Sequence, residues 1–171
     1  MAELSLRSAE TLSMPEYQVK AAFLYNFAKF VEWPKDAFRD TNSPIVIGVF
    51  GKDPFGLDLE KVVGQRKVNG RNVVIKRFNN VMDARSTQIV FVPASEQEHW
   101  IAMSKAIQGQ SVLTVGETTQ FVEAGGVAAL VLEGKIRITL NMEAARRARL
   151  AISSHLQNYA RIIRPGPSQP K

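Results

Sequence analysis

Hydrophobic positions recur along this chain with two different periods, which predict an alternation of helices and strands. Residues 16–32 carry apolar side chains at helical spacing, between a proline at position 15 and another at position 34. Residues 45–50, IVIGVF, form a continuous apolar run that is typical of a strand buried on both faces. The first segment is therefore predicted as a helix and the second as a strand.

The same alternation continues toward the C-terminus. Further strands are predicted at residues 73–77, 89–92, 111–115, 126–132 and 136–140. Further helices are predicted at residues 54–63, 95–107, 118–123 and 142–163. This order predicts a three-layer α/β domain, Rossmann-like, in which helices flank a mixed sheet of about six strands.

Local signals mark the ends of these elements. Asp53 before Pro54 predicts a helix N-cap, and Ser95 followed by Glu98 predicts a capping box. Asn141 is predicted to cap the last helix. Tight turns are expected at Asn69-Gly70 and at Glu133-Gly134-Lys135.

The first helix is apolar over more than half of its circumference. Val19, Phe23, Phe27 and Phe30 form its core stripe, and an outer-layer helix needs to bury only one side. The apolar surplus could pack on the C-terminal helix or on a second chain, and we expect it to serve a homodimer or a contact with another protein. The residues proposed for this interface are Leu24, Tyr25, Val31 and Trp33 from this segment, together with Arg146 and Arg147.

Length and composition fit one domain. The chain has 171 residues, 45% of them hydrophobic, and we place the domain at residues 16–163. Residues 1–15 are expected to be flexible, and residues 164–171 to form a disordered Pro-rich tail. No run approaches the roughly 20 apolar residues of a membrane span, and the start does not resemble a signal peptide. The chain is thus expected to be cytosolic, or exported with its leader removed.

The positive charge is concentrated near the C-terminus. Residues 135–171 hold eight basic residues and one acidic residue, within a chain whose net charge is +6. Such a face suits nucleic acid, an anionic membrane surface or an acidic protein, and is otherwise a solvated helix face. Nucleic acid is not expected, because no recognition module is present and the basic residues are not interleaved with aromatic ones.

The chain offers little of what catalysis requires. His99 and His155 are its two histidines, and each stands alone on a predicted helix without an HExxH neighbour. A GxSxG nucleophile elbow is missing, and no cysteine is present for a disulfide, a thiolate metal site or a nucleophile. We therefore expect no enzyme activity, no metal and no cofactor.

Two strand-to-helix loops could form a ligand pocket. The stretch GVFGKDPFG at residues 48–56 lacks the P-loop and dinucleotide signatures, so a tight turn is the favoured interpretation. Such loops nevertheless meet at one edge of a parallel sheet, where ligands bind. The residues proposed for this pocket are Asp53, Phe55, Thr114, Glu117, Thr118 and Arg137, the last of which needs a carboxylate or a ligand as partner.

Seven segments together resemble a known family. They are AAFLYNFAKFVEWP (21–34), IGVFGKDPFG (47–56), GQRKVNGRNV (64–73), QIVFVPASE (88–96), GQSVLTVGE (109–117), FVEAGGVAALVLEGKIRITLN (121–141) and AARRARLAISSHLQNYARII (144–163). In order and spacing they are similar to the YfiR-like family of bacterial periplasmic proteins, over about residues 16–163.

The resemblance implies a function that composition does not show. It implies a periplasmic, non-catalytic repressor that engages the periplasmic sensor region of a YfiN-type membrane diguanylate cyclase and so restrains cyclic-di-GMP synthesis and biofilm formation. A sensor domain that binds a small molecule in another membrane signalling system is the alternative. Family members often carry a cysteine where this chain has Thr87, so control through disulfides does not transfer to this chain.

Overall fold

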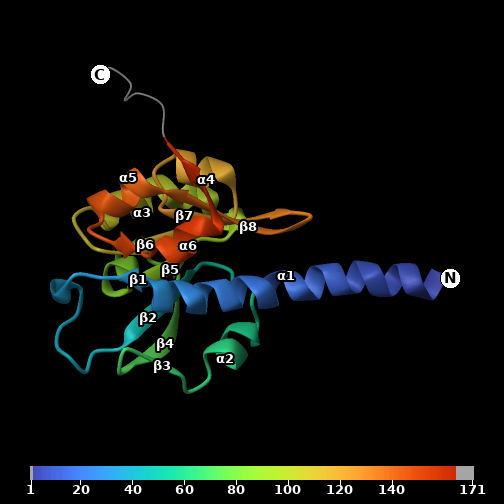
Figure 1. Ribbon diagram of the computed structural model, residues 1–171, viewed down its shortest axis with the longest axis horizontal. Coiled ribbons are helices and arrows are strands. Elements are labelled where there is room, and N and C mark those ends of the chain that lie inside the picture. The colour runs from blue at the N-terminus through green and yellow to red at the C-terminus, as the bar shows by residue number, and fades with distance from the viewer. Residues whose placement is uncertain (1, 165–171) are drawn as a thin grey trace.

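An eight-stranded mixed sheet forms the centre of the molecule (Figure 1). The computed structural model describes the backbone of residues 2–164 and the side chains of residues 16–164. The strands stand in the order β10-β8-β7-β6-β5-β2-β4-β3. Their bounds are β2 (Ile45–Phe50), β3 (Lys67–Val68), β4 (Arg71–Phe78), β5 (Ile89–Phe91), β6 (Leu113–Gly116), β7 (Ala128–Glu133), β8 (Lys135–Asn141) and β10 (Ala160–Ile163). Two further short strands, β1 (Val31–Glu32) and β9 (Ala151–Ile152), pair antiparallel.

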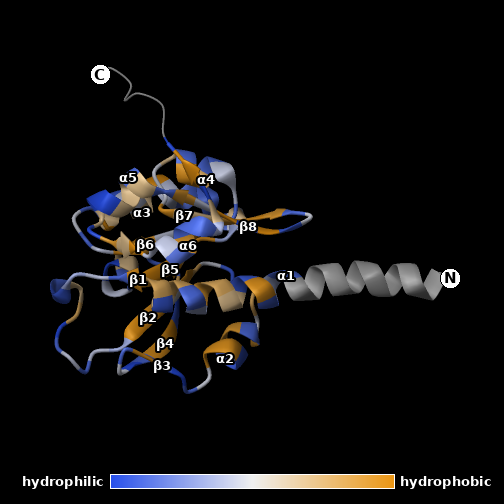
Figure 2. Cartoon of the chain, viewed as in Figure 1, coloured by the Kyte–Doolittle hydropathy of each residue, from blue (hydrophilic) through white to orange (hydrophobic). Residues whose placement is uncertain are grey.

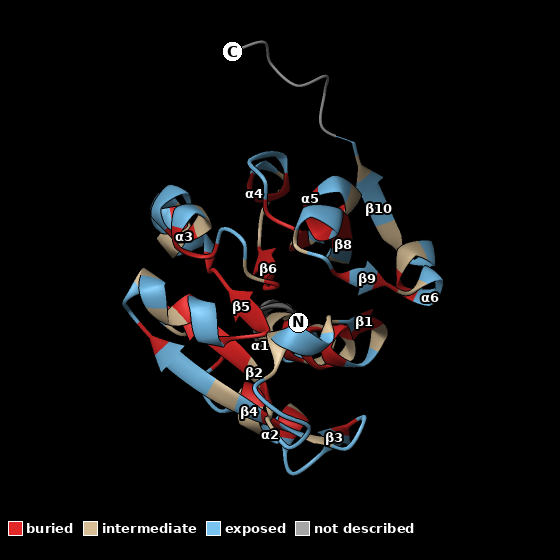
Figure 3. Ribbon diagram, turned by 90° about the vertical axis from the view of Figure 1, so that its left-hand side faces the viewer, coloured by how far each residue is buried: buried red, intermediate tan, exposed pale blue. Residues whose placement is uncertain are grey.

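Helices cover both faces of this sheet (Figures 1 and 3). They are α1 (Ala2–Phe30), α2 (Asp58–Val63), α3 (Trp100–Ala106), α4 (Thr119–Glu123), α5 (Met142–Arg147) and α6 (Ser154–Asn158), with short 3-10 turns η1 (Lys35–Ala37), η2 (Val81–Ser86) and η3 (Ala94–His99). One core cluster joins α1 and α2 to the sheet, and a second joins α3, α4 and η2 to the opposite face. The predicted three-layer α/β fold is confirmed.

The direction of winding reverses between β2 and β5. β2 pairs in parallel with β4 on one side and with β5 on the other. β5, β6 and β7 then continue in parallel, β8 returns antiparallel, and β10 pairs in parallel with β8. The carboxyl ends of β2 and β5 thus flank a topological switch point, where doubly wound domains bind ligands.

The six predicted strands correspond to β2, β4, β5, β6, β7 and β8. Figure 2 shows how hydrophobic residues follow the central strands, as continuous apolar runs require. The Asn69-Gly70 turn is confirmed as the β3–β4 connection, with positive φ angles of 52° and 79°. The sheet has eight strands rather than about six because β3 and β10 are too short to give a periodic signal.

The long helix predicted at residues 142–163 is wrong. The chain instead forms α5, β9, α6 and β10 in this segment. α5 ends at Arg147, and Arg149 just beyond it has a φ of 60° in the left-handed region, which stops the helix from continuing. Apolar residues three and four apart fit a helix, but they also fit two short helical turns that alternate with strands. Here pairing of β9 with β1 and of β10 with β8 decided the outcome.

Two predicted helix starts are wrong and the predicted cap at Asn141 is confirmed. α2 begins at Asp58, because the Asp53 side chain accepts from the Phe55 N–H and makes a turn instead. Ser95 lies within η3, so no capping box forms there. Asn141 does cap α5, accepting from the Ala144 N–H at 3.0 Å, and Thr118 caps α4.

The first helix buries a different stripe from the one predicted. Ala21, Leu24 and Phe27 are each 0% exposed, whereas Val19 is 39% exposed. Phe23 and Phe30 pack at the margin of the same core. The backbone of residues 2–15, predicted as a flexible segment, continues α1. The predicted tail lies outside the described residues from position 165 onward.

Candidate functional site

A buried lysine lies at the carboxyl edge of the sheet. Lys20 on α1 is 2% exposed, and its Nζ lies 2.6 Å from Glu117 Oε2 and 2.7 Å from Glu16 Oε2. The other oxygen of Glu117 accepts the Ala94 N–H at 2.8 Å. Both hydrogen-bonding edges of this carboxylate are therefore occupied by groups of the chain itself.

Tyr17 completes this group and joins it to the loop after β2. Its hydroxyl donates to Glu117 Oε2 at 2.9 Å, and its ring packs edge-on against Phe55 at 5.6 Å between centroids. Burial raises the pKa of Tyr17 well above its ordinary value, and the negative charge of Glu117 raises it further. We call Glu16, Tyr17, Lys20, Phe55 and Glu117 the carboxyl-edge cluster.

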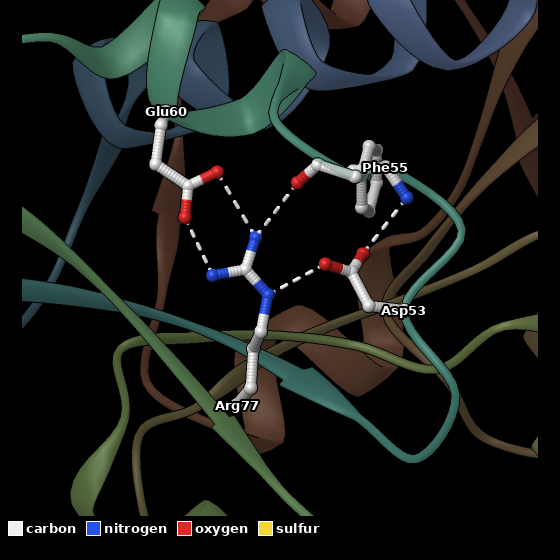
Figure 4. A network of polar contacts seen from close by, with 5 residues as sticks. Asp53, Phe55, Glu60 and Arg77 are labelled. Carbon is white, nitrogen blue, oxygen red and sulfur yellow. Dashed lines mark hydrogen bonds and ion pairs between the residues drawn. The ribbon is translucent and has the colours of Figure 1, made fainter.

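A second ion network holds the loop that follows β2 (Figure 4). Arg77 on β4 donates to Asp53 Oδ2 at 2.5 Å and to both oxygens of Glu60, at 2.5 and 3.0 Å. It also donates to the Gly56 carbonyl. Hydrogen bonding by Arg77 lowers the pKa of the Glu60 carboxyl, and the same bond raises the pKa of Arg77.

The switch-point crevice itself is filled by a glutamate. Glu96 accepts the Lys52 N–H at 3.2 Å and lies against Gly51. A Cβ on Gly51 would stand 2.3 Å from Glu96 Cδ, so a larger residue would displace this side chain, and the φ of 75° favours glycine as well. Lys20 and Arg77 each meet two carboxylates, and Glu96 adds another, so negative charge is in excess at this edge and disfavours anions such as phosphate.

The structure brings together some of the proposed pocket residues and separates others. Phe55 and Glu117 meet through Tyr17, and Thr118 donates to Gln97 Oε1 beside them. Thr114, in contrast, is buried within β6 and accepts the Val127 N–H. Arg137 lies exposed near the β7–β8 turn, 3.7 Å from Glu133, and does not belong to this edge.

The proposed interface residues divide in the same way. Leu24 and Val31, at 0% and 3% exposure, lie in the core of their own chain, and Tyr25 is buried as well. The prediction that these three form a partner surface is wrong for this structure, because Leu24 lies in the core, the Tyr25 ring faces Arg66, and Val31 belongs to β1, which pairs with β9. Trp33 is half-buried and donates to the Gln88 carbonyl at 3.1 Å.

The two arginines of the proposed interface do face solvent. Arg146 and Arg147 lie on the outer side of α5, and both pair with Glu143. Their exposure leaves them available to an acidic partner.

Sequence reasoning missed an exposed row of aromatic rings. His155 packs on Phe30 at 5.0 Å and on Tyr159 at 5.4 Å between ring centroids. Tyr159 is 73% exposed. We call Phe30, His155 and Tyr159 the aromatic patch. The helix predicted at residues 142–163 gave no reason to single out Tyr159.

The profile of the YfiR/HmsC-like family matches residues 17–161, which is most of the chain. The chain belongs to the YfiR/HmsC-like family. This family is one of periplasmic regulators, so a regulatory role in general follows from the match. No protein of curated function matches the chain in sequence.

Two solved structures resemble the fold of this YfiR/HmsC-like chain. A conserved domain protein from Vibrio cholerae O1 biovar eltor is 14% identical over 68% of this chain and 54% of its own, with a TM-score of 0.51. The ABC domain in complex with L-Trp from Streptococcus pneumonia is 13% identical over 75% of this chain and 58% of its own, with a TM-score of 0.52. The chain thus spans little more than half of either, and the likeness shows the fold alone.

Other site types find no support in the part of the YfiR/HmsC-like chain that the structure describes. Within residues 16–164, acidic, histidine and cysteine side chains nowhere gather in threes that could hold a metal ion. None of the helices there is long and apolar enough to cross a membrane. His99 lies between Phe50 and Glu96, 3.5 Å from the carboxylate, with no nucleophile beside it among its described contacts.

Proposed function

We propose that this chain is a non-catalytic regulator that acts in the periplasm. It binds the periplasmic sensor region of a membrane-bound diguanylate cyclase and represses cyclic-di-GMP synthesis. The observation that carries the proposal is the match of the YfiR/HmsC-like profile across residues 17–161, which covers nearly the whole domain. The polar groups at the switch point agree with it, because they are paired with one another and not arranged around a reacting atom.

The aromatic patch is the surface that we assign to the partner. Tyrosine and arginine are enriched among the residues that dominate binding energy at protein interfaces. Tyr159 exposes most of its ring, and Arg161 is exposed two residues further along the chain. The ring of Tyr159 packs edge-on against that of His155, and this contact restricts the tyrosine before a partner binds.

Deletion of the gene tests the function. Cellular cyclic-di-GMP, measured in the native bacterium, should rise on deletion and return to the parental level when the gene is restored. A deletion that leaves cyclic-di-GMP unchanged would exclude this role. An adjacent gene for a membrane protein with a diguanylate cyclase domain would identify the partner to be tested for binding.

Substitution tests the surface separately. Tyr159→Ala with His155→Ala should abolish repression while the purified variant keeps its fold. Ile101→Ala is the matched control, because Ile101 is 68% exposed on α3, on the opposite face of the sheet. If repression survives in the patch variant, the partner binds another surface, such as the one that carries Arg146 and Arg147.

We also propose a homodimer. Because one side of α1 is buried in its own chain, the dimer contact lies on another surface. Sedimentation velocity of the purified chain measures it directly. A dimer should persist in the Ile101→Ala variant, whereas a monomer at all concentrations would remove this part of the proposal.

A further inference from the structure

A polar cavity lies at the amino edge of the sheet, opposite the carboxyl-edge cluster. Its volume is about 250 Å³. Its floor is formed by the buried residues Thr87 and Ser111, which precede β5 and β6, and its rim carries Arg85, Arg149 and Asp36. The size suits a small ion or metabolite and is below the range of cavities that hold drug-sized ligands.

Ser111 is the informative residue of this cavity. It is 7% exposed, and its Oγ is the sole buried side-chain nitrogen or oxygen within residues 16–164 that has no hydrogen-bond partner. Thr87 beside it is satisfied, since its hydroxyl donates to the Ala84 carbonyl at 2.8 Å. A buried hydroxyl without a partner costs free energy, so a molecule that accepts its proton would gain affinity at this position.

Two guanidinium groups supply the charge. Arg85 donates from Nη1 to the Ala106 carbonyl at 2.8 Å, which fixes the side chain at the rim. Arg85 forms no ion pair with any residue that the structure describes, so its charge is not neutralised there. A guanidinium has five N–H groups, and those not used by Ala106 remain for an oxyanion.

Arg149 contributes a second cation that is partly neutralised. Its two terminal nitrogens lie 3.1 and 3.2 Å from the two oxygens of Asp36 on η1. This bidentate pair holds the guanidinium beside the cavity. With two cations and one carboxylate at the rim, the cavity carries a net positive charge.

We propose that this cavity binds a small oxyanion, a carboxylate or a phosphate group. The Ser111 hydroxyl and Arg85 donate to it, and Arg149 adds charge at the rim. The site is distinct from the aromatic patch and does not depend on the cyclase. It gives a physical basis for the alternative expectation that the chain senses a small molecule, and it moves that function from the carboxyl edge to the amino edge.

Anion titration of the purified full chain tests the proposal. Inorganic phosphate and malonate are compared with chloride at constant ionic strength, by calorimetry and by thermal unfolding. The anion that binds should raise the melting temperature of the parent. Arg85→Gln should weaken its binding about tenfold, as expected when one charge-assisted hydrogen bond is lost. Ser111→Ala should weaken it severalfold.

Arg146→Gln is the matched control, because Arg146 is an exposed arginine on α5 whose partner is Glu143 and not the cavity. Its variant should bind like the parent. Phosphate also stabilises proteins by exclusion from their surface, and that effect would raise the melting temperature of every variant equally. Equal shifts in all variants, or no shift with either anion, would overturn the proposal and leave the Ser111 hydroxyl to solvent.

Asp36→Asn provides a test of opposite sign. It removes the carboxylate that competes for Arg149, so the anion should bind more tightly. A variant that merely unfolds the site could not show this gain. Weaker or unchanged binding would overturn the assignment of Arg149 to the site.

Discussion

At the carboxyl edge of the sheet, Lys20 and Arg77 each meet two carboxylates, whereas at the amino edge Arg85 lies beside a cavity and a hydroxyl without a partner. The first edge includes the switch point, where a doubly wound fold ordinarily binds its ligand. Here the chain's own side chains fill that place. Fold topology shows where a site can be, but unsatisfied polar groups show where a ligand is still needed.

The largest effect that tests this comparison is expected at Lys20. Lys20→Met leaves Glu16 and Glu117 without their cation in a buried place, which should lower the free energy of unfolding by about 3–5 kcal/mol. Urea unfolding measures it, with Lys29→Met, an exposed change on the same helix, as control. Adding Glu117→Gln should restore part of the loss. A Lys20→Met variant as stable as Lys29→Met would show that the edge is not closed by this ion pair.

The two edges can be compared directly through one glycine from each. Gly51→Ala and Gly109→Ala both place a side chain at positive φ, of 75° and 83° respectively, at a cost of about 1–2 kcal/mol. At Gly51 the new Cβ also meets Glu96, whereas at Gly109 it meets nothing within 4 Å. Thermal unfolding should therefore show a larger loss for Gly51→Ala. Equal losses would contradict the claim that Glu96 fills the crevice.

Alkaline pH should weaken the carboxyl-edge cluster. Tyr17 ionises near its ordinary value of 10.0 when unfolded, but burial and Glu117 raise its pKa when folded. Its stabilising contribution is complete below pH 10 and is lost as the pH rises through the folded pKa. Tyr17→Phe should cost about 1 kcal/mol at pH 8 through the lost hydrogen bond.

The same variant should remove the part of the alkaline decline that comes from Tyr17. Urea unfolding at pH 8, 10 and 11 measures it. Tyr159→Phe, at an exposed position, is the control and should keep the pH dependence of the parent. An unchanged alkaline decline in Tyr17→Phe would show that Tyr17 does not report on the cluster.

The smallest effect is expected in the Arg77 network, which is partly exposed to solvent. Arg77→Gln should lower stability at pH 7 by less than about 1 kcal/mol. Because Arg77 lowers the pKa of Glu60, the contribution of this pair is present above the ordinary value of 4.5 and is lost as the pH falls through the folded pKa. Unfolding curves of parent and variant should converge below pH 4. A difference that persists in acid would assign the effect to packing of Arg77.

Much of the sheet could be predicted from the sequence, and much of the site could not. The apolar run of β2 and the Asn69-Gly70 turn are local signals, so their structures followed from neighbouring residues alone. Glu117 was singled out correctly as a residue at the sheet edge, but its partner Lys20 was not. Ninety-seven residues separate the two, and no local pattern predicts which buried lysine meets which carboxylate.

The aromatic patch and the amino-edge cavity were missed for a related reason. Tyr159 and Arg149 were both placed on one long helix, which the β1–β9 and β8–β10 pairings break up. In the structure Tyr159 is exposed and contacts His155, and Arg149 reaches Asp36. The spacing of apolar residues indicates which residues are buried. It does not distinguish one long helix from short helices that alternate with short strands, because both can bury residues at the same spacing.

The sequence by itself determined the α/β class, the six central strands, the cap at Asn141, and the family. These features depend on backbone preferences and on the burial pattern of a few neighbouring residues. Both can be read from a short segment of the sequence. Tertiary structure alone decided that Leu24 and Val31 are core and that Lys20 is buried between two carboxylates. It also left the Ser111 hydroxyl buried without a hydrogen-bond partner. Those outcomes depend on which residues from distant segments of the chain come into contact.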